Sequence, residues 1–155
     1  MRILKKAGLF FLFLFIAFLP SLSAIAVKTD GWYAALNKPA WNPPAYLFGP
    51  VWSLLYLTIG MAGYFAWTHG VRQKRRAAFI IYGLQLLLNA LWTPLFFGLH
   101  RIGWALADLI LLWFMVLFCM SVFSRHSRLA TGLMIPYFIW VSFAGVLNAV
   151  ILTMN

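Results

Sequence analysis

Five long runs of apolar residues, separated by short segments that carry almost all of the charge, constrain this sequence more than any other feature. The runs cover residues 7–27, 45–67, 77–99, 103–123 and 129–153. A helix needs about 20 mainly apolar residues to cross the hydrocarbon core of a bilayer. We therefore predict an all-α membrane protein, a five-transmembrane-helix bundle in which residues 1–155 form a single membrane domain.

The composition excludes a water-soluble fold. It indicates that the lipid bilayer surrounds the protein surface. Only 9% of the residues are charged, whereas an ordinary soluble domain has about 25%. The formal net charge of +10 would suggest nucleic-acid binding on a soluble surface. Here the basic residues flank apolar runs, where lipid headgroups and the membrane potential account for them, so we expect no nucleic-acid partner.

The first apolar run has two interpretations. Arg2, Lys5 and Lys6 precede it and small residues such as Ser23 lie near its end, a pattern shared with cleaved secretory signal peptides. Its length of about 21 residues favours a retained helix. Pro20 is expected either to kink this helix or to start its last turn.

The basic residues are distributed unevenly between the two sides of the predicted bundle. Nine Lys and Arg residues precede the first run or follow the second and fourth runs, and three (Lys28, Lys38 and Arg101) lie on the other side. The excess of basic residues on cytoplasmic loops predicts that the N-terminus is inside and the first loop outside. The sequence does not indicate which membrane is involved.

The connection over residues 28–44 is the longest and is rich in Trp, Pro and Asn. Trp32, Tyr33 and Trp41 are of the types that form aromatic belts at membrane interfaces. Belt formation does not explain why the same segment holds three prolines, at positions 39, 43 and 44. We expect this loop to be an ordered cap over the mouth of the bundle.

Aromatic and polar side chains recur at helical spacing within the runs and would share inward faces. They are Trp52 and Tyr56 in the second run, Gln85, Asn89, Trp92 and Phe96 in the third, and Trp140, Ala144 and Asn148 in the fifth. Convergence of aromatic faces with few polar groups is typical of a pocket for a flat apolar ligand. The alternative is ordinary helix packing with interhelical hydrogen bonds, and Asp108, the only acidic residue within a run, is interpreted as structural or orienting.

The sequence contains no motif for a metal site, a cofactor site or a catalytic triad. His69, His100 and His126 lie in separate connections, and Cys119 is the single cysteine, within an apolar run. These residues form neither a metal-ligand set nor a catalytic triad. We expect no metal and no cofactor.

Several motifs together resemble those of the TspO/translocator protein family, whose members are also called tryptophan-rich sensory proteins or peripheral benzodiazepine receptors. The matching segments are 32–44, Phe48-Gly49-Pro50-Val51-Trp52, Leu88-Asn89-Ala90-Leu91-Trp92, Gly103-Trp104-Ala105-Leu106 and Pro136-Tyr137. The short C-terminus without a basic tail resembles bacterial more than animal members. Tyr46 departs from the family, many members of which have Trp after the Pro-Pro pair.

The resemblance implies a five-helix bundle, often a homodimer, with a ligand pocket beneath the first loop. Family members bind porphyrins, notably protoporphyrin IX, and some bind sterols or benzodiazepine-like drugs. Residues 146–155 lack the Tyr and the Lys or Arg of the proposed sterol motif, which argues against a sterol ligand. By position, the implied ligand-binding residues are Trp32, Tyr33, Pro39, Pro43, Trp52, Tyr56, Asn89, Trp92, Phe96, Trp140, Ala144 and Asn148.

Three functions remain open at this point. The favoured one is a membrane sensor or transporter that binds a tetrapyrrole such as protoporphyrin IX. The second is an enzyme that degrades porphyrin with light and oxygen, in which Trp52 and Trp140 would be catalytic because they match the family's photochemical tryptophans. The third is a structural or interaction protein that acts through partner proteins.

Overall fold

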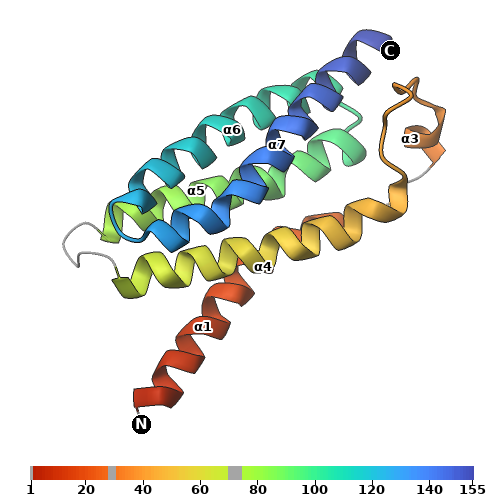
Figure 1. The fold of residues 1–155 in the computed structure, drawn as a ribbon. Coiled ribbons are helices and arrows are strands. Elements are labelled where there is room, and N and C mark those ends of the chain that lie inside the picture. The colour runs from red at the N-terminus through yellow and green to blue at the C-terminus, as the bar shows by residue number, and fades with distance from the viewer. Residues whose placement is uncertain (1, 28–30, 70–74) are drawn as a thin grey trace.

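The computed structural model describes residues 2–27, 31–69 and 75–155. The described residues form helices without any strand: α1 (Arg2–Phe18), α2 (Ser21–Ala26), α3 (Gly31–Ala35), α4 (Ala45–His69), α5 (Arg75–Thr93), the π-helix η2 (Pro94–Gly98), α6 (Ile102–Ser124) and α7 (Arg128–Met154) (Figure 1). The predicted all-α class is thus confirmed. Lys28, Arg72 and Lys74, three of the basic residues counted above, lie outside the described residues.

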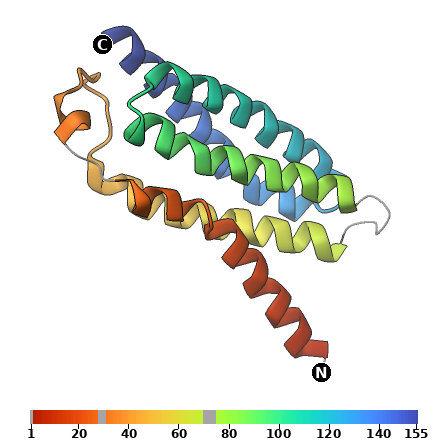
Figure 2. The ribbon, with the colours of Figure 1, turned by 180° about the vertical axis from the view of Figure 1, so that it is seen from behind.

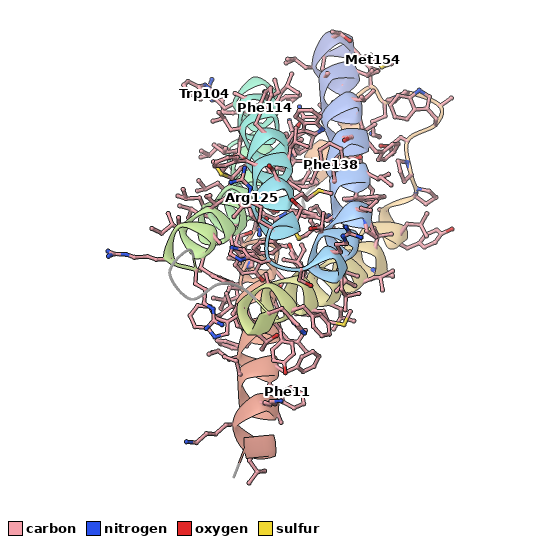
Figure 3. The ribbon with its side chains drawn as sticks, turned by 60° about the vertical axis from the view of Figure 1, so that its left-hand side comes forward. Phe11, Trp104, Phe114, Arg125, Phe138 and Met154 are labelled. Atoms are coloured by element: carbon pink, nitrogen blue, oxygen red, sulfur yellow. The ribbon has the colours of Figure 1, made fainter. Side chains whose placement is uncertain are left out.

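Four helices among the described residues are long and apolar enough to cross a membrane: α4, α5 with η2, α6 and α7. Helix α6 packs against both α5 and α7, while α4 packs against α7 and α1. Large apolar side chains face outward, among them Trp104 and Phe114 on α6, which are 70% and 59% exposed (Figure 3). Lipid favours such a surface and water does not.

The first predicted helix is not continuous, and its break is at Pro20. Proline has no N–H to continue the helical hydrogen bonds, so α1 ends at Phe18 and α2 begins at Ser21. Two serine hydroxyls satisfy carbonyls at the break: Ser21 Oγ donates to Phe18 O at 2.7 Å, and Ser23 Oγ donates to Pro20 O at 2.8 Å. Helix α2, with 6 residues, is too short to span alone, and α1 leaves the bundle at an angle (Figure 2).

The helix predicted for residues 77–99 begins earlier and changes its winding before its end. Helix α5 starts at Arg75, and η2 begins at Pro94, which cannot donate the next helical hydrogen bond. The following turn is wider, and Leu99 N donates to Pro94 O at 2.8 Å, five residues back. The other predicted helices agree with α4, α6 and α7 to within about two residues, which is the usual uncertainty of helix ends.

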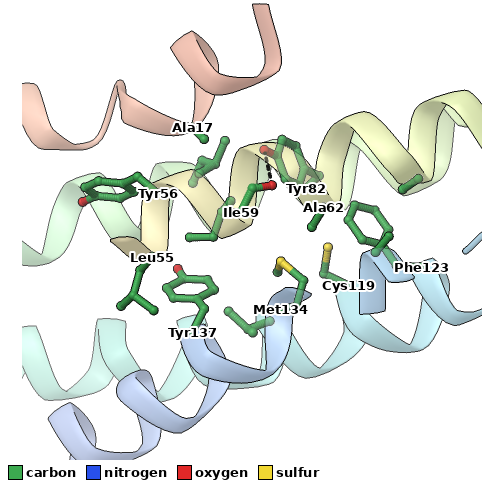
Figure 4. Close-up of a cluster of buried hydrophobic side chains, with 14 of the residues drawn as sticks. Ala17, Leu55, Tyr56, Ile59, Ala62, Tyr82, Cys119, Phe123, Met134 and Tyr137 are labelled. Carbon is green, nitrogen blue, oxygen red and sulfur yellow. Dashed lines mark hydrogen bonds between the residues drawn. The ribbon is translucent and has the colours of Figure 1, made fainter. Parts of the chain in front are cut away.

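The core lies where α1, α4, α5, α6 and α7 converge (Figure 4). Ile59, Met134 and Cys119 are fully buried there, so the single cysteine is a packing residue. Tyr82 projects into this apolar cluster, and its hydroxyl donates to the Ile59 carbonyl at 3.2 Å.

Helix α1 crosses α4 at two glycines. A Cβ on Gly60 would lie 2.9 Å from Leu14 Cα and 3.1 Å from the Phe13 carbonyl oxygen. A Cβ on Gly63 would lie 2.8 Å from the Phe13 ring. Small residues allow such close approach of helices in membranes.

We predict that Gly60→Ala lowers the free energy of unfolding by about 1–3 kcal/mol, because the added methyl group meets the α1 backbone. Gly83→Ala is the matched control, since Gly83 is on α5 and a Cβ added there would have no atom within 4 Å. That control should gain about 0.5–1 kcal/mol from helix propensity. Thermal unfolding in detergent micelles measures both, and a Gly60→Ala variant as stable as Gly83→Ala would contradict the close crossing.

Candidate functional site

A cavity of about 500 Å³ lies between the helices, on the side of the core toward α3. This volume is within the range of about 300–1,000 Å³ for small-molecule sites. Seven of the residues implied by the family resemblance line it: Tyr33, Trp52, Tyr56, Asn89, Trp92, Trp140 and Ala144. Trp32, Pro39, Pro43, Phe96 and Asn148 do not line it.

Aromatic rings from α4 and α7 form two adjacent walls of the pocket. Trp52 and Tyr56, one turn apart on α4, are stacked with ring centroids 5.4 Å apart and planes at 28°. Trp140 of α7 meets Trp52 edge to face, at 6.5 Å and 86°. Two faces that sandwich one flat ring must be parallel, so in this arrangement a planar ligand stacks on one of the two indoles only.

Asn89 is one of the polar residues that line the pocket, and its hydrogen bonds join three helices. The Tyr56 hydroxyl donates to Asn89 Oδ1 at 3.0 Å, and Asn89 Nδ2 donates to the Tyr137 hydroxyl at 3.1 Å. The Asn89 side chain is only 5% exposed. Its amide therefore serves two purposes, since it faces the cavity and also connects α5 to α4 and α7.

Trp92 is held from behind by two of the residues that do not line the pocket. Its indole N–H donates to Asn148 Oδ1 at 3.2 Å, and Asn148 Nδ2 donates to the Ile102 carbonyl at 3.0 Å. The Phe96 ring stacks on Trp92 at 5.1 Å and 23°. Asn148 and Phe96 thus position an aromatic wall of the pocket.

The loop segment after α3 is ordered by hydrogen bonds of its own. Lys38 Nζ donates to the Tyr33 and Leu36 carbonyls at 2.6 and 2.7 Å, which caps the C-terminal end of α3. The Tyr33 hydroxyl donates to Asn42 Oδ1 at 3.0 Å. Burial raises the pKa of the Tyr33 phenol above its ordinary value, with the hydrogen bond to Asn42 acting in the opposite direction, so this group is a neutral donor at pH 7.

Two further contacts fix the loop to other parts of the bundle. The Trp32 indole stacks on the His100 ring at 4.1 Å and 17°, just after η2. Asn37 N donates to Asn155 Oδ1 at 2.9 Å, Asn155 Nδ2 donates to Asn37 O at 3.0 Å, and Asn37 Nδ2 donates to the Met154 carbonyl at 3.2 Å. We call this Asn37–Asn155 pairing the loop tether.

Two other buried polar side chains stand apart from the cavity. Asp108 is 6% exposed and does not line the cavity, although its neighbour Leu109 does. Its Oδ2 atom has no hydrogen-bond partner in the described structure. Gln85, one turn from Asn89 on α5, is fully buried, and neither of its amide atoms has a partner among the described residues.

Several lining residues were missed by the sequence interpretation. They are Phe18, Ser21, Ala24, Ile25, Ala45, Phe48, Gly49, Ser53, Thr93, Phe97, Leu109 and Leu112. Thr93 and Phe97 extend the Asn89 stripe by i,i+4 steps, a spacing that could have identified them. Phe18 precedes Pro20, and Ser21 and Ile25 follow it. Their spacing of three and four residues would place all three on one face of a helix.

The described residues contain no cluster of three His, Cys, Asp or Glu side chains. His69 and His100 belong to opposite ends of the bundle, since His69 ends α4 and His100 follows η2.

These features define a class of integral membrane protein, a bundle of apolar helices around an internal aromatic pocket. Residues 9–154 match the profile described as the TspO/MBR family, and the chain belongs to this family. It is 40% identical to the Translocator protein of Bos taurus over 84% of this chain and 82% of the relative. It is also 40% identical to the Tryptophan-rich protein TspO of Archaeoglobus fulgidus, over 100% and 99% of the two chains, and 37% identical to the Tryptophan-rich sensory protein of Cereibacter sphaeroides, over 96% and 92%.

We predict that Asn89→Leu lowers the free energy of unfolding by about 1–3 kcal/mol, because the Tyr56 and Tyr137 hydroxyls then lose their buried partner. Tyr56→Phe removes one hydrogen bond and should cost about 0.5–1.5 kcal/mol. Tyr64→Phe, at a half-buried site on α4, should change stability by less than about 0.5 kcal/mol. Thermal unfolding in detergent compares the three variants, and equal effects of Tyr56→Phe and Tyr64→Phe would contradict the network.

Proposed function

We propose that this chain is a tetrapyrrole-binding sensor or transporter of the TspO family, which takes protoporphyrin IX or a related porphyrin into its aromatic pocket. The observation that carries the proposal is the cavity itself, with Trp52, Trp92 and Trp140 among its walls and Asn89 as a polar contact. A flat, mainly apolar macrocycle with a few polar groups has the chemistry that such a lining recognises. The names of the relatives, a translocator protein and a sensory protein, favour the same class of function.

In this proposal the macrocycle stacks on one indole and meets the other at its edge. Trp52 already stacks on Tyr56, and Trp140 is nearly perpendicular to Trp52, so a macrocycle parallel to one indole is nearly perpendicular to the other. The lining offers such a ligand several polar groups, among them the Asn89 amide and the Tyr56 hydroxyl. The same pocket is the proposed site for benzodiazepine-like drugs.

A second candidate function is light- and oxygen-dependent porphyrin degradation. It is favoured by the position of two readily oxidised indoles, Trp52 and Trp140, in edge contact on the same lining. A third candidate is a structural protein that acts through partner proteins. It is favoured by Asn89, whose amide oxygen and nitrogen both already have tyrosine partners.

The arrangement in the membrane is also proposed. We infer that α1 and α2 together make the first span, which gives five spans with the four long helices. The N-terminus and the α4–α5 turn then lie inside, and α3 and Asn155 lie outside. We further propose that the protein is a homodimer, as the family resemblance implies.

We predict that single cysteines near the N-terminus, between α4 and α5, or in the α6–α7 turn label from the inside, and single cysteines near α3 or Asn155 label from the outside. The experiment uses a Cys119→Ser background and an impermeant thiol reagent on oriented membranes. Labelling of positions near both ends of the chain from the same side would contradict five spans.

We predict that Trp52→Phe and Trp140→Phe bind protoporphyrin IX in darkness within about 1.5 kcal/mol of the parent protein, because Phe retains an aromatic face. A sensor or transporter would also keep the porphyrin Soret band unchanged under light in all proteins. Titration of the purified protein, first in darkness and then in light with oxygen, provides both measurements.

Trp104→Phe is the matched control, because Trp104 faces outward and is 70% exposed. Light-driven loss of the Soret band in the parent and the control, but not in the two pocket variants, would instead establish porphyrin degradation as the function. Absence of porphyrin binding to the parent would reject the proposal in favour of the structural protein.

A further inference from the structure

A second, more open cavity of about 560 Å³ lies at the α4–α5 end of the bundle, away from the aromatic pocket. It is lined by Trp67 near the end of α4 and by Arg75, Arg76, Phe79 and Ile80 in the first turns of α5. The cavity thus combines two guanidinium groups with apolar and aromatic surface.

The aromatic wall of this cavity is built from three helices. The Trp67 and Phe79 rings meet edge to face at 4.8 Å and 75°. Phe13 of α1 lies behind both, with centroids 6.0 Å from Trp67 and 5.5 Å from Phe79. The Arg75 guanidinium lies over the Trp67 ring, 5.4 Å from its centroid, so the charge is held against the wall.

The segments that form this end of the molecule carry positive charge only. The whole sequence contains two acidic residues, Asp30 and Asp108. Asp30 comes directly before α3 in the sequence and Asp108 is in the first third of α6, so neither belongs to the end of α4 or the start of α5. A basic surface without carboxylates in its own segments attracts anions.

We propose that this cavity binds one anionic phospholipid, such as phosphatidylglycerol. Its phosphate would contact Arg75 and Arg76, and an acyl chain would lie along Phe79 and Ile80. Basic pockets between helix ends are suited to anionic headgroups, and lipid is the solvent of this surface. A free phosphate ester would use the two arginines but leave the apolar wall uncovered, which favours the lipid.

The site is tested with purified protein in a neutral detergent, titrated with phosphatidylglycerol or phosphatidylcholine, with bound lipids counted by native mass spectrometry. We expect one preferred phosphatidylglycerol per chain. The double variant Arg75→Gln, Arg76→Gln should bind phosphatidylglycerol roughly 30-fold more weakly, because each basic residue contributes about fivefold. Arg125→Gln with Arg128→Gln is the matched control, because it removes the same charge from the exposed α6–α7 turn and should have little effect.

Ile80→Ala provides a second variant that does not threaten folding, since Ile80 is 55% exposed. It should weaken phosphatidylglycerol binding about threefold by removing apolar contact area. The site would be overturned in favour of diffuse surface charge by either of two results. One is an equal loss of phosphatidylglycerol affinity in the two double arginine variants, and the other is equal binding of both lipids by the parent protein. Displacement of the lipid by millimolar glycerol 3-phosphate, with Ile80→Ala unchanged, would overturn the lipid in favour of a free phosphate ester.

Discussion

The absence of water in the hydrocarbon core is the constraint on which the rest of this structure depends. A polar group at that depth needs a partner within the protein, because an unpaired one, such as the Gln85 amide, costs several kcal/mol. The Tyr56–Asn89–Tyr137 network meets this requirement between three helices, and the serine hydroxyls at Pro20 meet it for the backbone. Such hydrogen bonds therefore act together with close packing, as at Gly60 and Gly63, to hold the bundle together, because apolar side chains gain little from leaving lipid for protein.

The pocket lies between two places in the described residues where proline interrupts an α-helix. Pro20 separates Phe18 from Ser21 on one side of the cavity, and Pro94 separates Thr93 from the π-helical residue Phe97 on the other. Irregular backbone is tolerated at membrane depth where it borders a cavity or is satisfied locally. The residues on either side of these two prolines thus line the cavity.

Much of the pocket could be predicted from sequence, because helical spacing alone places residues such as Trp52 and Tyr56 on one face. The relative angle of Trp52 to an indole on another helix could not, since it depends on how two helices rotate against each other. Pro20 indicated a kink, but the serine hydrogen bonds that complete the break depend on local geometry. Leu109 and Leu112 line the cavity, yet nothing distinguishes them in sequence from leucines that face lipid.

The loop tether gives the proposed receptor a way to report occupancy at a distance. Asn37 and Asn155 are 118 positions apart in sequence, and their hydrogen bonds join the loop to the last turn of α7. Tyr33, on the same loop, lines the pocket. By linkage, a ligand that binds better when the tether is closed strengthens the tether by the same factor that the tether strengthens ligand binding. The end of α7 then carries information about the pocket without touching the ligand.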